Sequence, residues 1–206
     1  MKLLGLGAAV GLAVCLTACG SIVSNTPRVP TVSPNSPPEA TAPQLTPTEI
    51  TVPAINAHSS LVPLGLVDPK TKKPSPTGEL EAPDVHNPMQ AGFYKYGVMP
   101  CSSPGPAVII GHVDGRVNGK PAEGIFFNLK KLAEGDTATV TMSDGRTCTY
   151  RVYQVVHVDK AQFPTDRVYG NTDKPELRMI TCGDQFVGGE LGYKNNIIAF
   201  ARLAGT

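Results

Sequence analysis

The apolar segments of this chain are short, and they are interrupted by glycine, proline or an Asp-Gly pair. The clearest lies at residues 176–183, Glu-Leu-Arg-Met-Ile-Thr-Cys-Gly, where a few apolar residues are followed by a glycine. A run of this length fits a β-strand better than a helix. The 206 residues also include 21 glycines and 20 prolines but no tryptophan. These features together predict an all-β fold with many loops.

A β-hairpin is predicted in the second half of the chain. Residues 137–142 alternate, with Ala138, Val140 and Met142 on one face and threonines on the other. An Asp-Gly pair at positions 144 and 145 favours a tight turn, and residues 147–158 resume as a strand. The alternation of this second strand puts five residues on one face: Cys148, Tyr150, Val152, Val156 and Val158. Cys148 is therefore expected to be a buried core thiol. Residues 126–132 are the one segment with a helical pattern, and a single closed β-barrel or sandwich suits residues 48–206.

The N-terminal segment has the pattern of an export signal. Met1 and Lys2 precede an apolar run, residues 3–16, that is too short to span a membrane comfortably. The run ends in Leu-Thr-Ala-Cys, which resembles the lipobox of bacterial lipoproteins. That resemblance implies that Cys19 receives diacylglycerol and anchors the protein to the extracytoplasmic face of the cell membrane. An ordinary secretory signal whose cleavage site contains a cysteine is the alternative.

Three regions follow from this reading: a lipoprotein-like signal peptide at residues 1–19, a tether at 20–47 and a folded domain at 48–206. The tether is rich in proline, serine and threonine and has few large apolar residues, so it cannot bury enough surface to fold. The formal net charge is +1 at pH 7, which gives no indication of a nucleic-acid partner.

Two side chains suited to thiolate chemistry stand at strand ends. Cys182 ends the strand at residues 176–183, and His112 directly follows a second short strand at 107–111. A cysteine and a histidine are the minimum requirement for a thiolate nucleophile with its proton donor and acceptor. In an exported protein Cys101 and Cys148 could instead form a disulfide, which would leave Cys182 as a free thiol.

Several segments resemble a sortase, and within that family the actinobacterial class F type. The resemblance spans the whole predicted domain and rests on residues 50–55, 105–114, 126–129, 163–170, 177–183 and 193–203. It implies an eight-stranded sortase β-barrel with short helical turns. It also implies a cysteine transpeptidase that cleaves a C-terminal Leu-Pro-x-Thr-Gly-like sorting signal of surface proteins through a thioacyl-enzyme. The acyl group would pass to an amine acceptor on a peptidoglycan precursor or another protein.

Carried onto this chain, the resemblance makes Cys182 the nucleophile and His112 the general acid and base, with no metal or organic cofactor. Sortases also use an arginine that steadies the substrate or its oxyanion, and this chain has no arginine at the corresponding place. Asn196 matches that position best, and an amide can donate to an oxyanion. Arg178 is the competing candidate because it shares a strand face with Cys182. It could equally line a substrate groove or be a surface residue.

The connection between residues 160 and 174 corresponds to one wall of the sortase substrate groove. We therefore expect Phe163, Val168 and Tyr169 to contact the sorting signal, together with Ile180 on the Cys182 face. Alternatively, these side chains pin a loop onto the barrel. Asp114 either orients the His112 ring or caps the turn that follows it.

Two other functions remain open from the sequence. One is a cysteine endopeptidase or hydrolase on the same fold, because acceptor use leaves no sequence pattern. The other is a catalytically weak, lipid-anchored peptide-binding module, which the missing arginine favours and the presence of Cys182 and His112 opposes. The chain lacks the Ser/Thr-His-Gly-Cys cluster of L,D-transpeptidases.

Overall fold

The computed structural model describes residues 45–102, 104–188 and 192–204. The predicted signal peptide with Cys19, and the predicted tether up to residue 44, lie outside these residues. The last residue assigned to the tether, Pro47, already belongs to the first strand.

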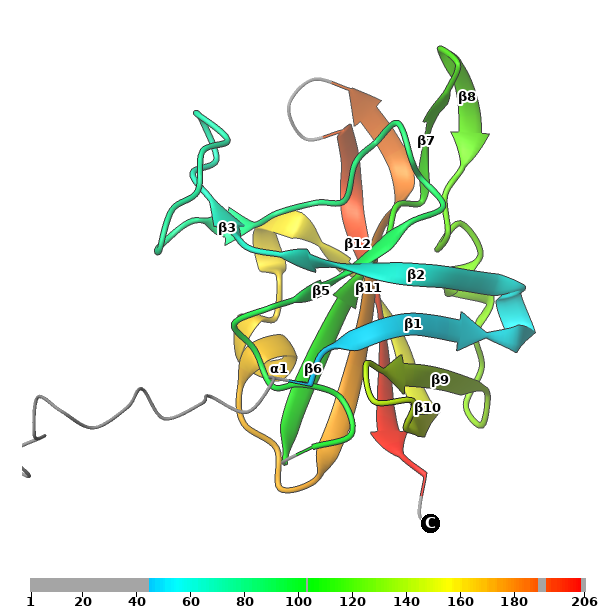
Figure 1. Ribbon diagram of the computed structural model, residues 1–206. Coiled ribbons are helices and arrows are strands. Elements are labelled where there is room, and N and C mark those ends of the chain that lie inside the picture. Colours follow the sequence, from blue (N-terminus) through cyan, green and yellow to red (C-terminus); the bar gives the residue numbers. More distant parts are fainter. Residues whose placement is uncertain (1–44, 103, 189–191, 205–206) are drawn as a thin grey trace, which may run out of the picture. The chain divides into compact units, whose positions relative to one another are not determined.

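The architecture is a closed barrel of eight strands, as predicted (Figure 1). The barrel order is β1-β2-β5-β6-β11-β12-β10-β9, and two further pairs, β3-β4 and β7-β8, form separate two-stranded sheets. The barrel strands are β1 (Pro47–Val52), β2 (Ala57–Leu64), β5 (Ala91–Tyr94), β6 (Gly105–Ile110), β9 (Thr137–Met142), β10 (Thr147–Asp159), β11 (Pro175–Gly188) and β12 (Gly192–Leu203). The remaining elements are β3 (Leu66–Val67), β4 (Glu79–Leu80), β7 (Asp114–Val117), β8 (Lys120–Glu123), the helix α1 (Thr165–Tyr169) and three 3₁₀ turns, η1 (Pro53–Ile55), η2 (Leu129–Lys131) and η3 (Lys160–Gln162).

The main core fills the barrel. In β9 the apolar face predicted from alternation points inward, since Ala138, Val140 and Met142 are at most 3% exposed. Tyr150 of β10 and Phe126, which precedes η2, are completely buried in the same cluster. Burial of these side chains is the main source of the barrel's stability.

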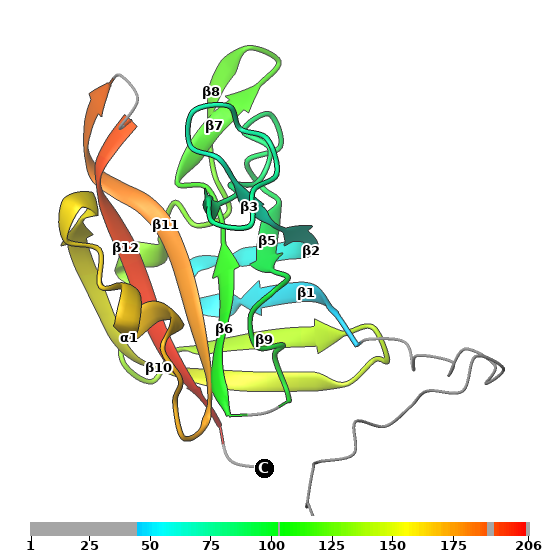
Figure 2. The ribbon, with the colours of Figure 1, turned by 90° about the vertical axis from the view of Figure 1, so that its left-hand side faces the viewer.

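A second, smaller apolar cluster lies on the outer face of the barrel. Val108 of β6, Ile180 of β11 and Phe200 of β12 belong to it, and α1 covers them with Val168 (Figure 2). α1 was not predicted from the sequence. Helical structure was expected at residues 126–132, where the structure has the 3₁₀ turn η2. α1 is a helix of five residues, too short to show a 3.6-residue pattern in the sequence.

A β-bulge changes the predicted face of the second half of β10. The pairing with β12 shifts between Val152 and Gln154. Val152 therefore belongs to the barrel core, whereas Val156 and Val158 pack with the outer cluster. The prediction that all these valines share one face is wrong, because an extra residue in one strand reverses the alternation beyond it.

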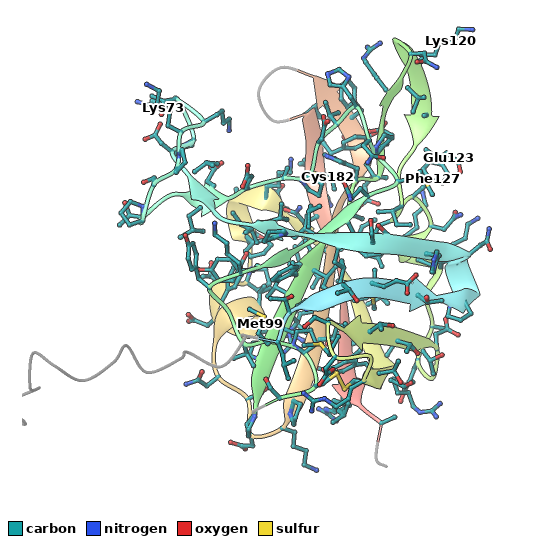
Figure 3. All side chains as sticks on the ribbon, viewed as in Figure 1. Lys73, Met99, Lys120, Glu123, Phe127 and Cys182 are labelled. Carbon is teal, nitrogen blue, oxygen red and sulfur yellow. A yellow bond between two sulfur atoms is a disulfide. The ribbon has the colours of Figure 1, made fainter. Side chains whose placement is uncertain are left out.

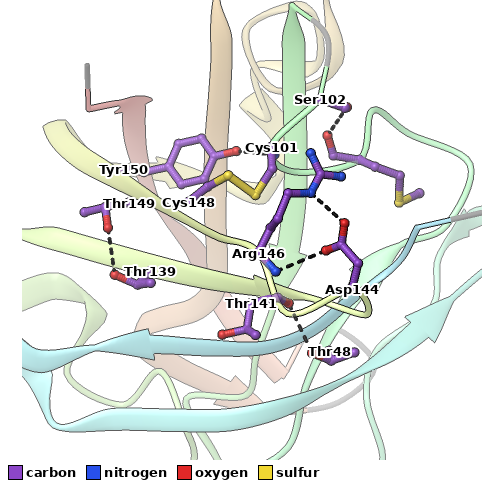
Figure 4. The surroundings of a disulfide bond; sticks show 11 residues. Thr48, Cys101, Ser102, Thr139, Thr141, Asp144, Arg146, Cys148, Thr149 and Tyr150 are labelled. Carbon is purple, nitrogen blue, oxygen red and sulfur yellow. Dashed lines mark hydrogen bonds and ion pairs between the residues drawn. A yellow bond between two sulfur atoms is a disulfide. The ribbon is translucent and has the colours of Figure 1, made fainter. Parts of the chain in front are cut away.

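Cys101 and Cys148 form a disulfide that joins the loop before β6 to the start of β10 (Figure 4). The Cα atoms of the pair are 5.6 Å apart. The backbone N–H of Cys101 donates a hydrogen bond to the hydroxyl of the buried Tyr150 at 3.0 Å. The interpretation of Cys148 as a free core thiol is therefore wrong. Among the described residues Cys182 is the free cysteine.

Two hairpins project from the same end of the barrel in both ribbon views (Figures 1 and 2). One consists of β7 and β8, and the other of the last part of β11 and the first part of β12. Over the part of the chain that the structure describes, no helix is long and apolar enough to span a membrane.

Candidate active site

Cys182 lies in β11 directly opposite Asn196 of β12 in the antiparallel register. It is half-buried, and Figure 3 shows it at the end of the barrel from which the two hairpins project. One amide N–H of Asn196 donates to the backbone carbonyl of Thr181 at 3.3 Å. A side-chain amide has two N–H donors, so the second stays available for a ligand beside Cys182.

His112 follows β6, the strand that pairs with β11 in parallel. The paired residues Ile110 and Ile180 end this ladder, and the N–H of Gly111 adds one more bond to the Ile180 carbonyl at 3.1 Å. His112 and Cys182 each come two residues after that last pair. Because β6 and β11 run parallel and are paired in this register, His112 and Cys182 lie at the same end of the barrel, although β11 itself continues to Gly188.

The His112 ring has a defined hydrogen-bond partner. Its Nε2 lies 2.7 Å from the backbone carbonyl of Pro83. A carbonyl can only accept, so Nε2 carries a proton whether the ring is neutral or charged. Nδ1 is therefore the nitrogen that can gain and lose a proton. The Pro83 carbonyl was not found by sequence reasoning, because any residue can supply a backbone oxygen.

The backbone at His112 is held by hydrogen bonds from the segment that follows β8. The N–H of Phe126 donates to the His112 carbonyl at 3.0 Å, and the N–H of Gly124 donates to the Val113 carbonyl at 2.9 Å. A Cβ atom at Gly124 would lie 2.2 Å from the His112 carbonyl oxygen. A glycine is therefore required where this segment passes His112.

A groove of about 1270 Å³ reaches Cys182 and Asn196 along the outer face of the barrel. Phe163 and Tyr169, at the two ends of the α1 region, line it together with Tyr94, the last residue of β5, and Tyr96 just beyond that strand. Ile180 also lines it, beside Val108 and Ile110. Three of the four predicted substrate-binding residues thus border one mainly apolar groove with the predicted nucleophile.

Val168, the fourth, is not at the groove. Its side chain is completely buried and packs in the outer cluster under α1. This matches the packing alternative given for the loop.

Arg178 is also buried, at 2% exposure, which excludes the surface-residue alternative. Its guanidinium forms an ion pair with Glu176 at 2.6 Å, donates to the Arg167 carbonyl at 3.2 Å and stacks over Phe200 with its Cζ atom 4.7 Å from the ring centroid. It does not line the groove that contains Cys182. The structure therefore brings Asn196, and not Arg178, beside Cys182, the predicted nucleophile.

Asp114 does not bond to the His112 ring. Its carboxylate accepts a hydrogen bond from the hydroxyl of Tyr193, which lies on β12 three residues before Asn196. Burial, the bond to Asp114 and the nearby charges of Asp114 and Cys182 together raise the pKa of Tyr193 to about 12. Tyr193 was missed by sequence reasoning, since nothing local connects it with a residue so distant in the chain.

The sequence of residues 50–204 matches a family model described as "Sortase domain". The match covers most of the chain and nearly all of the barrel. The protein belongs to the sortase family. A cysteine and a histidine delivered together to one end of a barrel agree with a family of cysteine transpeptidases. No curated protein matches this sortase at a significant level.

Solved sortase structures share the fold of this sortase. A lid mutant of sortase A from Corynebacterium diphtheriae has a TM-score of 0.56 at 20% identity, covering 77% of this chain and 69% of the other. A sortase D5 transpeptidase from Clostridium perfringens has a TM-score of 0.51 at 19% identity, covering 76% and 78%. Sortase C1 from Streptococcus agalactiae, in complex with MTSET, has a TM-score of 0.56 at 15% identity, covering 78% and 70%.

These comparisons support the barrel fold and the family, and they do not assign a sortase class. Among the side chains that the structure describes, no three His, Cys, Asp or Glu residues gather closely enough to hold a metal ion.

Proposed function

We propose that this sortase is a class F-type transpeptidase that cleaves a Leu-Pro-x-Thr-Gly-like sorting signal and transfers the acyl fragment to an amine on the cell wall. The observation that carries the proposal is a groove with mainly apolar walls that is lined by both Cys182 and Asn196. The delivery of His112 to the same end of the barrel supports it further.

The chemistry requires one proton carrier and one nucleophile. The Cys182 thiolate attacks the carbonyl carbon of the scissile peptide bond, and an oxyanion forms. Protonated His112 donates its Nδ1 proton to the leaving amine as the C–N bond breaks, which leaves a thioester on Cys182. Neutral His112 then takes a proton from the attacking amine, and the thiolate departs as the new amide forms.

The hydrogen bond from His112 Nε2 to the Pro83 carbonyl supports the use of Nδ1 for proton transfer. It holds the ring in one orientation and leaves Nδ1 for both proton transfers. A mobile ring could present either nitrogen and would lose the precise geometry that proton transfer needs.

Asn196 is the proposed oxyanion donor in place of the usual arginine. It lies opposite Cys182 and has one amide N–H beyond the one that bonds to Thr181. Arg178 would have to leave its buried ion pair with Glu176 to reach the same place. Breaking a buried pair leaves an uncompensated charge, which makes that movement costly.

The groove favours an extended peptide with apolar side chains. Its lining includes the aromatic residues Tyr94, Tyr96, Phe163 and Tyr169 and two charged residues, Glu79 and Lys160. Such a surface suits a leucine and a proline better than charged side chains.

The class F assignment and the membrane anchor rest on sequence resemblance. The Gly-His-Val-Asp and Thr-Cys-Gly segments and those between them support the class, and Leu-Thr-Ala-Cys at residues 16–19 supports lipidation of Cys19. Labelling with a clickable fatty acid, compared between the wild type and Cys19→Ala, tests the anchor. Label that persists in the variant would contradict lipidation at Cys19.

The activity is tested with the purified full chain and a quenched Leu-Pro-x-Thr-Gly peptide library, with and without an amine acceptor. We expect cleavage to yield an amide product when the amine is added, and to vanish in Cys182→Ala and His112→Ala. Cleavage that gives the same hydrolysis product with and without the amine would instead identify a hydrolase. Absence of cleavage with every peptide, together with an unreactive Cys182, would identify a peptide-binding module.

A further inference from the structure

The hydrogen bond between Tyr193 and Asp114 joins the two chain segments that follow the predicted catalytic residues. Asp114 begins β7, two residues after His112, and Tyr193 lies on the strand that pairs with β11 beyond Cys182. The β6–β11 ladder has already ended at Ile110 and Ile180. The Tyr193–Asp114 bond therefore connects the two projecting hairpins at a point where the barrel ladder no longer does.

The Tyr193 ring is itself fixed on the hairpin. It pairs with Phe186 across the β11–β12 ladder, and the two ring centroids are 5.2 Å apart in an edge-to-face arrangement. The hydroxyl is thus presented to Asp114 by a ring that has little freedom to turn. A hydrogen bond to a carboxylate is also stronger than one between neutral groups.

Tyr193 is not suited to stabilise the oxyanion directly. A phenol has one proton, and that of Tyr193 is donated to Asp114. To donate to an oxyanion it would have to give up that bond and leave the carboxylate without its partner.

We propose that Tyr193 and Asp114 form a positioning pair that sets the placement of His112 relative to Cys182. This inference rests on the proposed transpeptidase function and adds two residues to it. The bond transmits its effect through the backbone, because Asp114 is two residues from His112 and β12 is paired with β11 at Cys182. Without it, the two hairpins can separate, and the thiol and the imidazole lose their alignment.

The expected signature is a fall in kcat with little change in KM, because the peptide groove does not include either residue. A misplacement of the order of one ångström can lower the rate about 100-fold, so we expect kcat to fall roughly 10- to 100-fold in Tyr193→Phe and in Asp114→Ala. Tyr193→Phe and Asp114→Ala each remove the same hydrogen bond. Their effects should therefore not add, and kcat of the double variant should lie within about twofold of the slower single variant. Asp114→Asn retains an acceptor oxygen and should recover part of the activity.

The matched control is Tyr153→Phe. Tyr153 also donates from its hydroxyl to a carboxylate, that of Glu176, at 2.9 Å, and Glu176 precedes Cys182 by six positions on the same long strand. The control therefore removes the same kind of bond away from the active site. We expect it to leave kcat within about twofold of the wild type.

A second measurement needs no peptide substrate. Alkylation of Cys182 by iodoacetamide in the full chain, followed by mass spectrometry of the peptide that carries Cys182, gives a rate and its pH profile. We expect this profile to be displaced in Tyr193→Phe and Asp114→Ala and unchanged in Tyr153→Phe.

The results separate the two proposals. If the wild type cleaves no peptide but the alkylation profiles differ as expected, the proposed function fails and the positioning pair stands. Unchanged kcat and unchanged alkylation profiles in both pair variants would overturn the positioning role. A loss of kcat accompanied by an equal loss in Tyr153→Phe would likewise overturn it, as an effect on general stability.

Discussion

Asn196 stands opposite Cys182 in the register of β11 and β12, and both side chains border the same groove. Removing one oxyanion donor commonly lowers kcat by about 10²–10³-fold, and we expect that loss in Asn196→Ala. Peptide cleavage kinetics provide the measurement, with circular dichroism to verify folding. An Asn196→Ala enzyme with normal kcat would show that another group stabilises the oxyanion.

Arg178 is expected to affect stability more than chemistry. Arg178→Ala leaves the Glu176 carboxylate in a buried site with Arg202 as its remaining cation, at 3.4 Å. Breaking a buried pair typically lowers the free energy of unfolding by about 3–5 kcal/mol, and urea denaturation measures that loss. If kcat per folded molecule fell as much as in Asn196→Ala, Arg178 would be the residue that reaches the substrate.

Gly124→Ala should displace the backbone of His112, the predicted general acid and base, without touching its ring. The new Cβ would meet the His112 carbonyl oxygen at 2.2 Å, so the His112 backbone must move. We expect kcat/KM to fall by roughly 10-fold or more, measured on the same peptide. Gly65→Ala is the matched control, because its nearest neighbour would be the flexible Lys95 Cε atom at 3.4 Å. Equal activity of the two variants would contradict the close approach at His112.

The disulfide is expected to stabilise the barrel. It closes a loop with a sequence separation of 47, and removing a bridge of this kind typically costs about 2–4 kcal/mol. Cys101→Ser combined with Cys148→Ser should show this loss in chemical denaturation. An unchanged unfolding midpoint, or free thiols at both positions in the wild type, would contradict the bridge.

Tyr193 should ionise at unusually high pH. Its pKa is raised from 10.0 to about 12, first by burial and then by the bond to Asp114. A raised pKa means that the folded state favours the protonated hydroxyl, so this contribution to stability is complete below pH 10 and is lost as the pH rises towards 12. An ultraviolet titration of phenolate, taken as the difference between wild type and Tyr193→Phe, gives the midpoint. A midpoint near 10 would contradict both the burial of the phenol and its hydrogen bond to Asp114.

The strands were predictable where a single residue pattern dictated them. β9 followed its alternation without exception, and the Asp-Gly turn fixed the hairpin to β10. In β10 the alternation predicted the wrong face beyond Val152. A β-bulge adds one residue to a strand there, and the local sequence does not indicate it. The candidate pair Cys182 and His112 could be proposed from the sequence because cysteine and histidine are chemically distinctive. β6 ends just before His112, as expected, whereas β11 continues past Cys182 to Gly188.

The rest of the site depends on contacts between distant segments. Arg178 shares a strand face with Cys182, as the sequence indicated, yet α1 covers that face and turns the arginine into a buried ion-pair partner. The bond from Tyr193 to Asp114 and the acceptor oxygen of Pro83 connect segments whose proximity only the closed barrel creates. Composition and periodicity carry no information about such pairs.

The Cys101–Cys148 bridge also has a bearing on oxidative folding. Once the bridge has formed, neither Cys101 nor Cys148 can form a non-native disulfide with Cys182. No other free thiol remains in the part of the chain that the structure describes. Oxidation of Cys182 there requires a thiol from outside the barrel or stepwise oxygenation of the sulfur. Among the described residues, the bridge thus removes the two cysteines that could otherwise form a disulfide with Cys182.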